Sequence, residues 1–322
     1  MTEPWIGPAG QRMERLELHV TYTCPERCLF CSEEHRMASF RRLPVTWGRV
    51  ATVLRTHAAR GVRAVHLTGG EPTIHPRFVD ILRLAKKLGM RTSVGTIGTM
   101  LSRPDFARRA LPLLDEALFS LHGPDAATHD AMTRRPGSFE QVTAAIRLAR
   151  DSSTGGGTGG GTGVYINTVI TRHNVQRLPE TAALAHDLGA ALLIVSNTTP
   201  EGAALDAYEA LAVPLDTLAR ILPRVPERAR DTVVRFFGVP MCLLGEHRML
   251  SNDLHWDPRV TVEWGQQGDK VVLDGIYSWT PARRRAHVAS CGGCAVQELC
   301  TGVYERYAEL WPVDALQPLP RP

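Results

Sequence analysis

Between residues 15 and 200, short apolar runs alternate with longer segments in which apolar residues recur at helical spacing. The short runs are rich in β-branched residues and bounded by polar ones, which predicts strands. Thr46 and Ser138 stand where helix N-caps are expected, and Gly61, Gly89 and Gly189 stand just past predicted helix ends. The strands are predicted at residues 16–22, 63–68, 91–96, 116–122, 164–171 and 190–197.

Six strand–helix units follow one another at intervals of roughly 25–35 residues, which is the spacing of a parallel sheet with helical crossovers. The pattern therefore predicts an α/β fold. Periodicity alone leaves two architectures open, an open doubly wound sheet and a partial barrel.

The rest of the chain has a different organisation. Residues 205–230 read as helix interrupted by prolines, and residues 260–264 and 270–276 read as a hairpin. We therefore predict three parts: a barrel at 1–204, a helical linker at 205–238 and a small metal-binding unit at 239–322. The glycine-rich segment 152–163 is predicted to be a flexible linker, because a phosphate-binding loop would run from a strand into a helix and carry a lysine.

Composition narrows the class of protein. The chain has 322 residues, of which 43% are apolar and 22% charged, as in ordinary globular proteins. A formal charge of +4 is spread along the chain, and without a basic stripe rich in aromatic residues we expect no nucleic-acid partner. No run of eighteen apolar residues and no signal-peptide pattern occurs, so we expect no membrane association and a cytoplasmic location.

Seven cysteines fall into an N-terminal group of three and a C-terminal group of four. Reduced cysteines in the cytoplasm more often bind metal than form disulfides. The first group, in TCPERCLFC, follows the first strand directly and supplies Cys24, Cys28 and Cys31. Three thiolates can hold three irons of a [4Fe–4S] cluster and leave the fourth iron open, as catalytic metals require. The alternative is a zinc site completed by a distant ligand such as His19 or His35.

A second motif, LTGGEPTIHP, lies at the carboxyl end of the second predicted strand. Its glycines allow a close approach of the backbone, and Glu71 offers a carboxylate suited to an ammonium group. Because parallel strands end at one edge of a sheet, this carboxylate is expected beside the cysteine loop.

TCPERCLFC together with TGGEP resembles the radical S-adenosylmethionine (SAM) superfamily. The resemblance spans roughly residues 15–202 and implies a partial (β/α)6 TIM barrel. It implies that Cys24, Cys28 and Cys31 hold a [4Fe–4S] cluster whose open iron binds SAM. The reduced cluster would cleave SAM to a 5′-deoxyadenosyl radical that abstracts a substrate hydrogen. Gly69, Gly70 and Glu71 would meet the methionine amino group, and Phe30 matches the position that usually lies against adenine.

The same resemblance implies further contacts at the ends of later strands. Ser120 resembles a polar residue that family members use for SAM, and Asn167 or Arg172 is expected to face the cavity. His122 is a candidate catalytic residue in contact with the substrate. The loop at 195–202 corresponds to one near adenine. Arg134 and Arg135, which follow in the sequence HDAMTRRPGSF, are expected to be solvated rather than bound to an anion.

The C-terminal cysteines are Cys242, Cys291, Cys294 and Cys300, the last three in CGGCAVQELC. By spacing alone four thiolates fit zinc or a [4Fe–4S] cluster. The region resembles the SPASM/Twitch extensions of radical SAM enzymes, in the form with one auxiliary cluster. That resemblance implies a second [4Fe–4S] cluster, fully held by cysteine, with a role in electron transfer or structure.

Two kinds of substrate fit this reading. The first hypothesis is oxidation, carbon–carbon coupling or epimerisation of a small molecule such as a sugar, aminocyclitol or nucleoside. The alternative is a peptide-modifying maturase that forms a crosslink or thioether on a ribosomal precursor peptide. Only about fifteen residues precede the first predicted strand, which favours the small substrate, because peptide maturases often carry an N-terminal recognition domain. With every cysteine used as a ligand, epimerisation would need another hydrogen donor, such as Tyr165 or Tyr208. A flavodoxin- or ferredoxin-type protein is the expected reductant.

Overall fold

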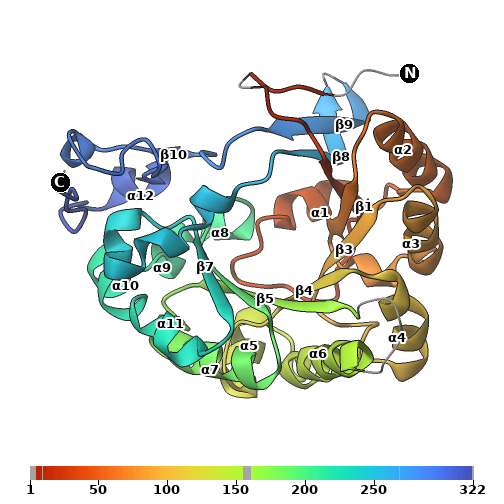
Figure 1. Ribbon diagram of the computed structural model, residues 1–322, viewed down its shortest axis with the longest axis horizontal. Helices are drawn as coiled ribbons and strands as arrows, with labels where there is room; N and C mark the ends of the chain where they lie inside the picture. Colours follow the sequence, from red (N-terminus) through yellow and green to blue (C-terminus); the bar gives the residue numbers. More distant parts are fainter. Residues whose placement is uncertain (1–4, 9, 155–160, 268, 321–322) are drawn as a thin grey trace.

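The computed structural model describes residues 5–8, 10–154, 161–267 and 269–320. A nine-stranded sheet with the order β7-β6-β5-β4-β3-β2-β1-β8-β9 curves into a partial barrel, and helices surround its outer side (Figure 1). All neighbouring strands are parallel except β8 and β9, so the expected α/β fold with a partial barrel is confirmed. The strands of this sheet are β1 (Arg15–Thr21), β2 (Ala64–Gly69), β3 (Arg91–Thr96), β4 (Glu116–Ser120), β5 (Gly163–Ile170), β6 (Leu192–Asn197), β7 (Val233–Phe237), β8 (Arg259–Gln267) and β9 (Lys270–Ser278).

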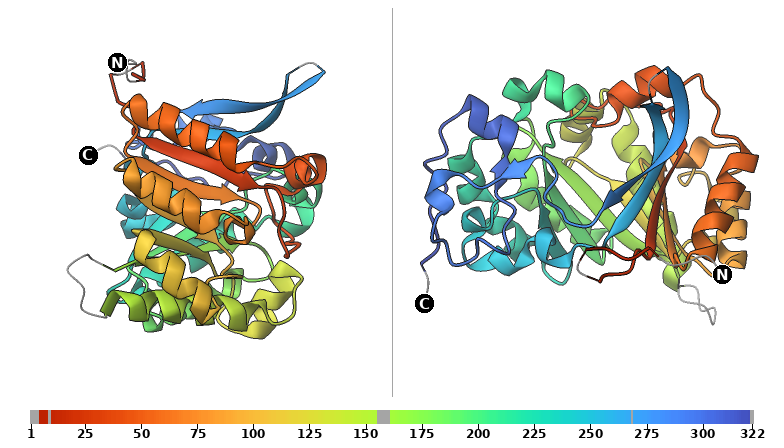
Figure 2. Two further views of the ribbon diagram at one scale, coloured as in Figure 1. Left: turned by 90° about the vertical axis from the view of Figure 1, so that its right-hand side faces the viewer. Right: turned by 90° about the horizontal axis from the view of Figure 1, so that it is seen from above.

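Most of the helices lie along the outside of the strands, as the two further views show (Figure 2). In α3, for example, Phe78, Ile81, Leu82 and Ala85 are buried at helical spacing. The N-cap predicted at Thr46 is present, since its side chain accepts a hydrogen bond from the amide of Arg49. The helices are α1 (Glu34–Phe40), α2 (Trp47–Ala59), α3 (Phe78–Lys87), α4 (Pro104–Ala110), α5 (Ala126–Thr133), α6 (Ser138–Thr154), α7 (Leu178–Asp187), α8 (Ala203–Asp206), α9 (Tyr208–Leu211), α10 (Leu215–Ile221), α11 (Arg224–Ala229) and α12 (Glu305–Leu310).

The two faces of the sheet differ in polarity. Along β1, Leu16, Leu18 and Val20 are fully buried and belong to the apolar core, while Glu17 and His19 alternate with them. Glu17 contacts Arg259 of β8 through an Oε1–NH1 distance of 2.7 Å, inside the barrel. Parallel sheets are usually apolar on both faces, so a polar interior indicates that the inside of the barrel serves chemistry.

Two details of the expected organisation are wrong. The segment predicted as a helical linker, 205–238, contains helices α8 to α11 but ends in the strand β7, which extends the barrel sheet beside β6. The hairpin predicted within the C-terminal unit is formed by β8 and β9, but β8 pairs in parallel with β1 and so completes the barrel sheet. The division at 1–204, 205–238 and 239–322 stays a prediction. Residues 155–160 of the expected glycine-rich linker lie outside the described residues.

The C-terminal segment beyond the hairpin lies beside α10 (Figure 1). It contains the short strands β10 (Arg285–Ala286) and β11 (Val303–Tyr304), the 3-10 turn η6 (Ala289–Cys291) and α12. A buried, two-fold ion pair fixes it, because Arg285 donates to both oxygens of Asp253 at 3.0 and 2.7 Å. Asp253 also accepts a hydrogen bond from the hydroxyl of Thr301, one residue after Cys300. None of the helices in the described ranges is long and apolar enough to cross a lipid bilayer.

Replacing Asp253 by alanine leaves the buried guanidinium of Arg285 without its carboxylate partner, with one hydrogen bond to the carbonyl of Pro281 remaining. Breaking a buried ion pair in this way costs about 3–5 kcal/mol, so we expect a clear drop in the urea midpoint of unfolding. The control is Arg108→Ala, which removes the exposed Asp105–Arg108 pair and should cost about 1 kcal/mol or less. An Asp253→Ala variant as stable as this control would contradict the role of the pair.

Candidate active site

A cavity of about 360 Å³ lies inside the barrel at the carboxyl ends of its strands. Most of the residues predicted to form the site line it together. They are Cys24, Cys28, Phe30, Cys31, Gly69, Gly70, Glu71, Ser120, His122 and Asn167.

The cysteine loop, residues 23–31, is held on two sides. The amides of Arg27 and Leu29 donate to the carbonyls of Thr133 and Met132 at 3.2 and 3.0 Å, which joins the loop to the end of α5. On the other side, the amide of Ala203 donates to the carbonyl of Cys31 at 2.9 Å. The backbone of the loop is therefore held on both sides by hydrogen bonds to other segments of the chain.

The Gly-Gly-Glu segment holds the start of the cysteine loop by direct backbone contact. The amide of Gly70 donates to Thr21 at 2.8 Å, and the amide of Glu71 donates to Thr23 at 2.9 Å. A Cβ atom at Gly69 or Gly70 would lie 2.2 or 2.3 Å from one of these carbonyl oxygens. Glycine is required here because two backbones touch. The predicted contact of both glycines with the methionine amino group stays a prediction.

The carboxylate of Glu71 is fully buried and accepts four hydrogen bonds. Its Oε1 faces the amide and hydroxyl of Thr73 and the hydroxyl of Thr96, and its Oε2 accepts from the amide of Ile97 at 2.8 Å. Burial raises the pKa of Glu71, and these hydrogen bonds oppose the rise. A carboxylate has about four acceptor sites, and Oε2 has one to spare for the predicted ammonium group.

His122 lies just beyond the end of β4, although the strand was predicted to include it. Its ring meets Phe30 edge-on at 4.6 Å between centroids, and its Nδ1 accepts from the amide of Val169 at 3.2 Å. Burial lowers the pKa of His122 well below its usual range. The ring is therefore neutral, with its proton on Nε2.

Ser120 and Asn167 both line the cavity, as predicted. Asn167 is oriented by Ser196, whose hydroxyl donates to its Oδ1 at 2.7 Å. Arg172, the other residue predicted to face the cavity, does not line it. Its Nε donates to the carbonyl of Ala212 at 2.7 Å, and it lines a separate pocket near α10 and α12.

Two tyrosines considered as hydrogen donors do not line the cavity. The hydroxyl of Tyr165 donates to Glu116 at 3.1 Å, and the ring of Tyr208 packs on Trp311. Arg134 is exposed as expected, whereas Arg135 is half-buried.

Several cavity residues were not predicted. His66 and Ser196 follow the alternation of β2 and β6, so the strand pattern carried their signal. Asn197 and Thr199 belong to the loop expected near adenine. Phe237 comes from β7, which was not recognised as a strand.

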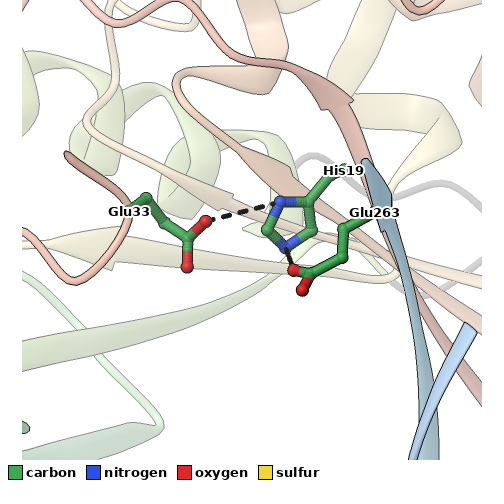
Figure 3. Close-up of side chains that lie close together, drawn as sticks. All are labelled: His19, Glu33 and Glu263. Atoms are coloured by element: carbon green, nitrogen blue, oxygen red, sulfur yellow. Dashed lines mark ion pairs between the residues drawn. The ribbon is translucent and has the colours of Figure 1, made fainter. Parts of the chain in front are cut away.

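His19 lies between two carboxylates, those of Glu33, which directly precedes α1, and Glu263 of β8 (Figure 3). Its Nδ1 faces Glu33 at 3.6 Å and its Nε2 faces Glu263 at 3.5 Å, on opposite sides of the imidazole (Figure 3). Arg36 bridges the other oxygens of the two carboxylates at 3.3 and 2.8 Å. The imidazole and the two carboxylates meet the spacing of a metal site, and Arg36 supplies positive charge to both carboxylates. With His35 paired to Asp206 at 2.7 Å, the idea of a zinc site completed by either histidine is not supported.

The four C-terminal cysteines line one small pocket next to the barrel. Backbone amides point at their sulfurs: Met241 and Gly302 donate to Cys300 at 3.5 and 3.4 Å, and Leu319 donates to Cys294 at 3.4 Å. Amide donors of this kind stabilise ligating thiolates.

The donor atoms at both cysteine sites are all sulfur. Four thiolates around one zinc lie roughly 3.8 Å apart, as a tetrahedron with 2.3 Å bonds requires. Among the described residues, the groups of three possible ligands with donor atoms within 4.8 Å are His19–Glu33–Glu263 and Glu34–His35–Asp206, and neither contains a cysteine. All-sulfur donor sets of three and four cysteines suit a multi-iron cluster.

Comparison with known proteins identifies the class. Residues 18–185 match the family model of the radical SAM superfamily, more than half of the chain, and the protein belongs to this superfamily. Its cofactors are accordingly a [4Fe–4S] cluster and SAM.

The chain is also similar to particular members of this superfamily. A PqqA peptide cyclase from Gluconobacter oxydans is 31% identical over 203 residues, 62% of this chain and 53% of the relative. An AdoMet-dependent heme synthase from Methanosarcina barkeri is 28% identical over 57% of this chain and 50% of the relative. The chain thus spans about half the length of these curated relatives. The solved structure of Streptococcus suis SuiB bound to precursor peptide SuiA has a TM-score of 0.52 at 18% identity, over 69% of this chain and 46% of SuiB, and shares the fold.

A Gly70→Ala substitution should disrupt the cysteine loop, because the new methyl group meets the carbonyl of Thr23. We expect most of the iron bound at the N-terminal site to be lost, measured as iron per chain after anaerobic reconstitution. Gly48→Ala is the matched control, since a Cβ there has open space and helix α2 gains stability. Full iron loading of Gly70→Ala would show that the backbone contact is dispensable.

A Cys24/Cys28/Cys31→Ala variant separates the two cysteine sites. We expect about four irons per chain to remain, held by the C-terminal cysteines. The measurement is iron and acid-labile sulfide after anaerobic reconstitution. Loss of all iron with one zinc bound would make the C-terminal site structural and would contradict the second cluster.

Proposed function

We propose that this radical SAM enzyme modifies a precursor peptide, by forming a crosslink or thioether within it. The observation that carries the proposal is the 31% identity to a PqqA peptide cyclase over 203 residues. Further PqqA peptide cyclases align over up to 74% of the chain. This relationship favours the peptide alternative over the small-molecule hypothesis drawn from the sequence.

The cavity supports a substrate that enters as a single side chain. A volume of about 360 Å³ lies at the small end of ligand sites, and SAM occupies much of it. A peptide would lie across the open end of the barrel and insert one residue. Phe237 and Thr199 stand at the side of the cavity that adjoins the C-terminal segment, because Thr199 hydrogen-bonds to Tyr304 at 3.1 Å.

Each part of the site has a role in this proposal. Cys24, Cys28 and Cys31 would hold the catalytic [4Fe–4S] cluster, which would supply the electron for the reductive cleavage of SAM. The Gly-Gly-Glu segment fixes the cysteine loop, and Glu71 orients the amino group of SAM through Oε2. Neutral His122 donates a hydrogen bond from Nε2 to the cofactor or the peptide.

The C-terminal cysteines would hold a second [4Fe–4S] cluster that accepts the electron released when the substrate radical is oxidised. Cys242, Cys291, Cys294 and Cys300 fill all its iron positions, so the peptide does not bind there. A small electron-carrier protein of the flavodoxin or ferredoxin type is the proposed reductant.

The test is SAM cleavage driven by peptide. Reconstituted enzyme, SAM and reductant are incubated with synthetic precursor peptides, with a PqqA peptide as the first probe. We expect the peptide to increase the formation of 5′-deoxyadenosine several-fold. We also expect the mass of the peptide to fall by two hydrogens. Peptide deuterated at the reacting carbon should transfer deuterium into 5′-deoxyadenosine.

Two controls decide the outcome. A Cys242→Ala variant should still cleave SAM but form little modified peptide, if the second cluster removes the electron. Stimulation by sugars or nucleosides, with none by any peptide, would reject the proposal and restore the small-molecule hypothesis.

A further inference from the structure

The cysteine loop separates two hollows of the molecule. Cys24, Cys28 and Cys31 line the cavity inside the barrel, and the same three residues line a cleft of about 690 Å³ on the outer side of the loop. The cleft is bounded by α1, the end of α5 and the start of α8. The cleft therefore gives access from the protein surface to the outer side of the cysteine loop without passing through the cavity.

Arginines dominate the exposed charge of this cleft. Arg27 of the loop, Arg41 at the end of α1 and Arg134 at the end of α5 line it and are exposed. None of the three makes an ion pair or a side-chain hydrogen bond in the described part of the chain. Exposed arginines elsewhere in the protein are either paired with carboxylates, as Arg77 and Arg91 are, or unpaired, as Arg55 is. The three arginines of the cleft differ in lying together beside the cysteine loop.

Two exposed carboxylates, those of Glu34 and Asp206, also line the cleft and offset part of the arginine charge. Glu34 and Asp206 both lie against His35, at 3.8 and 2.7 Å from its Nε2. Glu26 is buried, with only 4% of its surface exposed, and faces the thiol of Cys28. The exposed lining therefore keeps a net positive charge, three guanidinium groups against two carboxylates, which attracts an acidic partner.

We propose that this cleft is the docking surface for a small acidic one-electron carrier protein. The inference rests on the proposed radical SAM reaction, in which the cluster must gain one electron for each SAM cleaved. The carrier is oxidised by one electron and the cluster on the cysteine loop is reduced by one. Substrate and SAM occupy the inner side of the loop, so delivery from the outer side leaves them undisturbed.

Interfaces for electron transfer are small and weak, and their association depends on steering by charge. Reversing the charges should therefore slow association more than it disturbs folding. Arg41→Glu/Arg134→Glu is the test variant, because both residues lie outside the cysteine loop. Arg55→Glu, an exposed and unpaired arginine on α2, is the matched control.

Association of purified flavodoxin, and separately of a plant-type ferredoxin, is measured by surface plasmon resonance at low and high salt, without SAM or peptide. For at least one carrier we expect the double variant to associate about tenfold more slowly at low salt, with the difference shrinking at high salt. Bleaching of the cluster by that reduced carrier should slow in parallel, while bleaching by reduced methyl viologen should not. Iron content equal to that of the unsubstituted protein shows that the variant is folded.

Three results would overturn the proposal. In the first, neither carrier binds the unsubstituted enzyme. In the second, the Arg55→Glu control slows association as much as the double variant. In the third, the double variant binds both carriers normally but loses affinity for a precursor peptide, which would assign the cleft to the substrate. These measurements contain no peptide turnover, so they can fail while the proposed peptide chemistry holds, and the reverse.

Discussion

The active site depends on one close contact between two stretches of backbone. The end of β2 touches the start of the cysteine loop at Gly69 and Gly70, where no side chain fits between the chains. This contact fixes the position of the cysteine loop relative to the end of β2. It also directs Glu71 toward the end of β3, where the amide of Ile97 and the hydroxyl of Thr96 hold its carboxylate. The ends of the neighbouring strands β1, β2 and β3 are thereby linked to one another beside the cavity.

The two cysteine sites use the protein in opposite ways. The N-terminal cysteine loop lies between two hollows, the cavity on one side and the open cleft on the other. The C-terminal cysteines lie in a small pocket, where backbone amides approach the sulfurs. The first arrangement suits a cluster that must meet a cofactor, and the second suits a cluster that stays closed. Cysteine count and spacing indicated this difference before any contact was known.

Much of the barrel could be predicted because the outer face of each strand is apolar and each following helix has one apolar face. Residues within strands, such as Ser120 and Asn167, were placed correctly, since alternation determines the face on which they lie. Arg172 was misplaced because β5 ends at Ile170, and alternation says nothing beyond the end of a strand. The strand β7 was missed because it has only five residues and follows a helical stretch broken by prolines. The group of side chains around His19 joins three distant segments, and no local pattern reveals such a contact.

The pairing of β1 with β8 has a consequence for the order of folding. Partners in this pair, such as Glu17 and Thr261, are 244 residues apart in the sequence. During synthesis, β2 can pair with one edge of β1 long before β8 emerges from the ribosome. The other edge of β1 stays unpaired while most of the chain is made. Closing so long a loop is slow, and an open strand edge invites pairing with other chains. Yield of the native enzyme should therefore depend on how long the nascent barrel stays open at this edge.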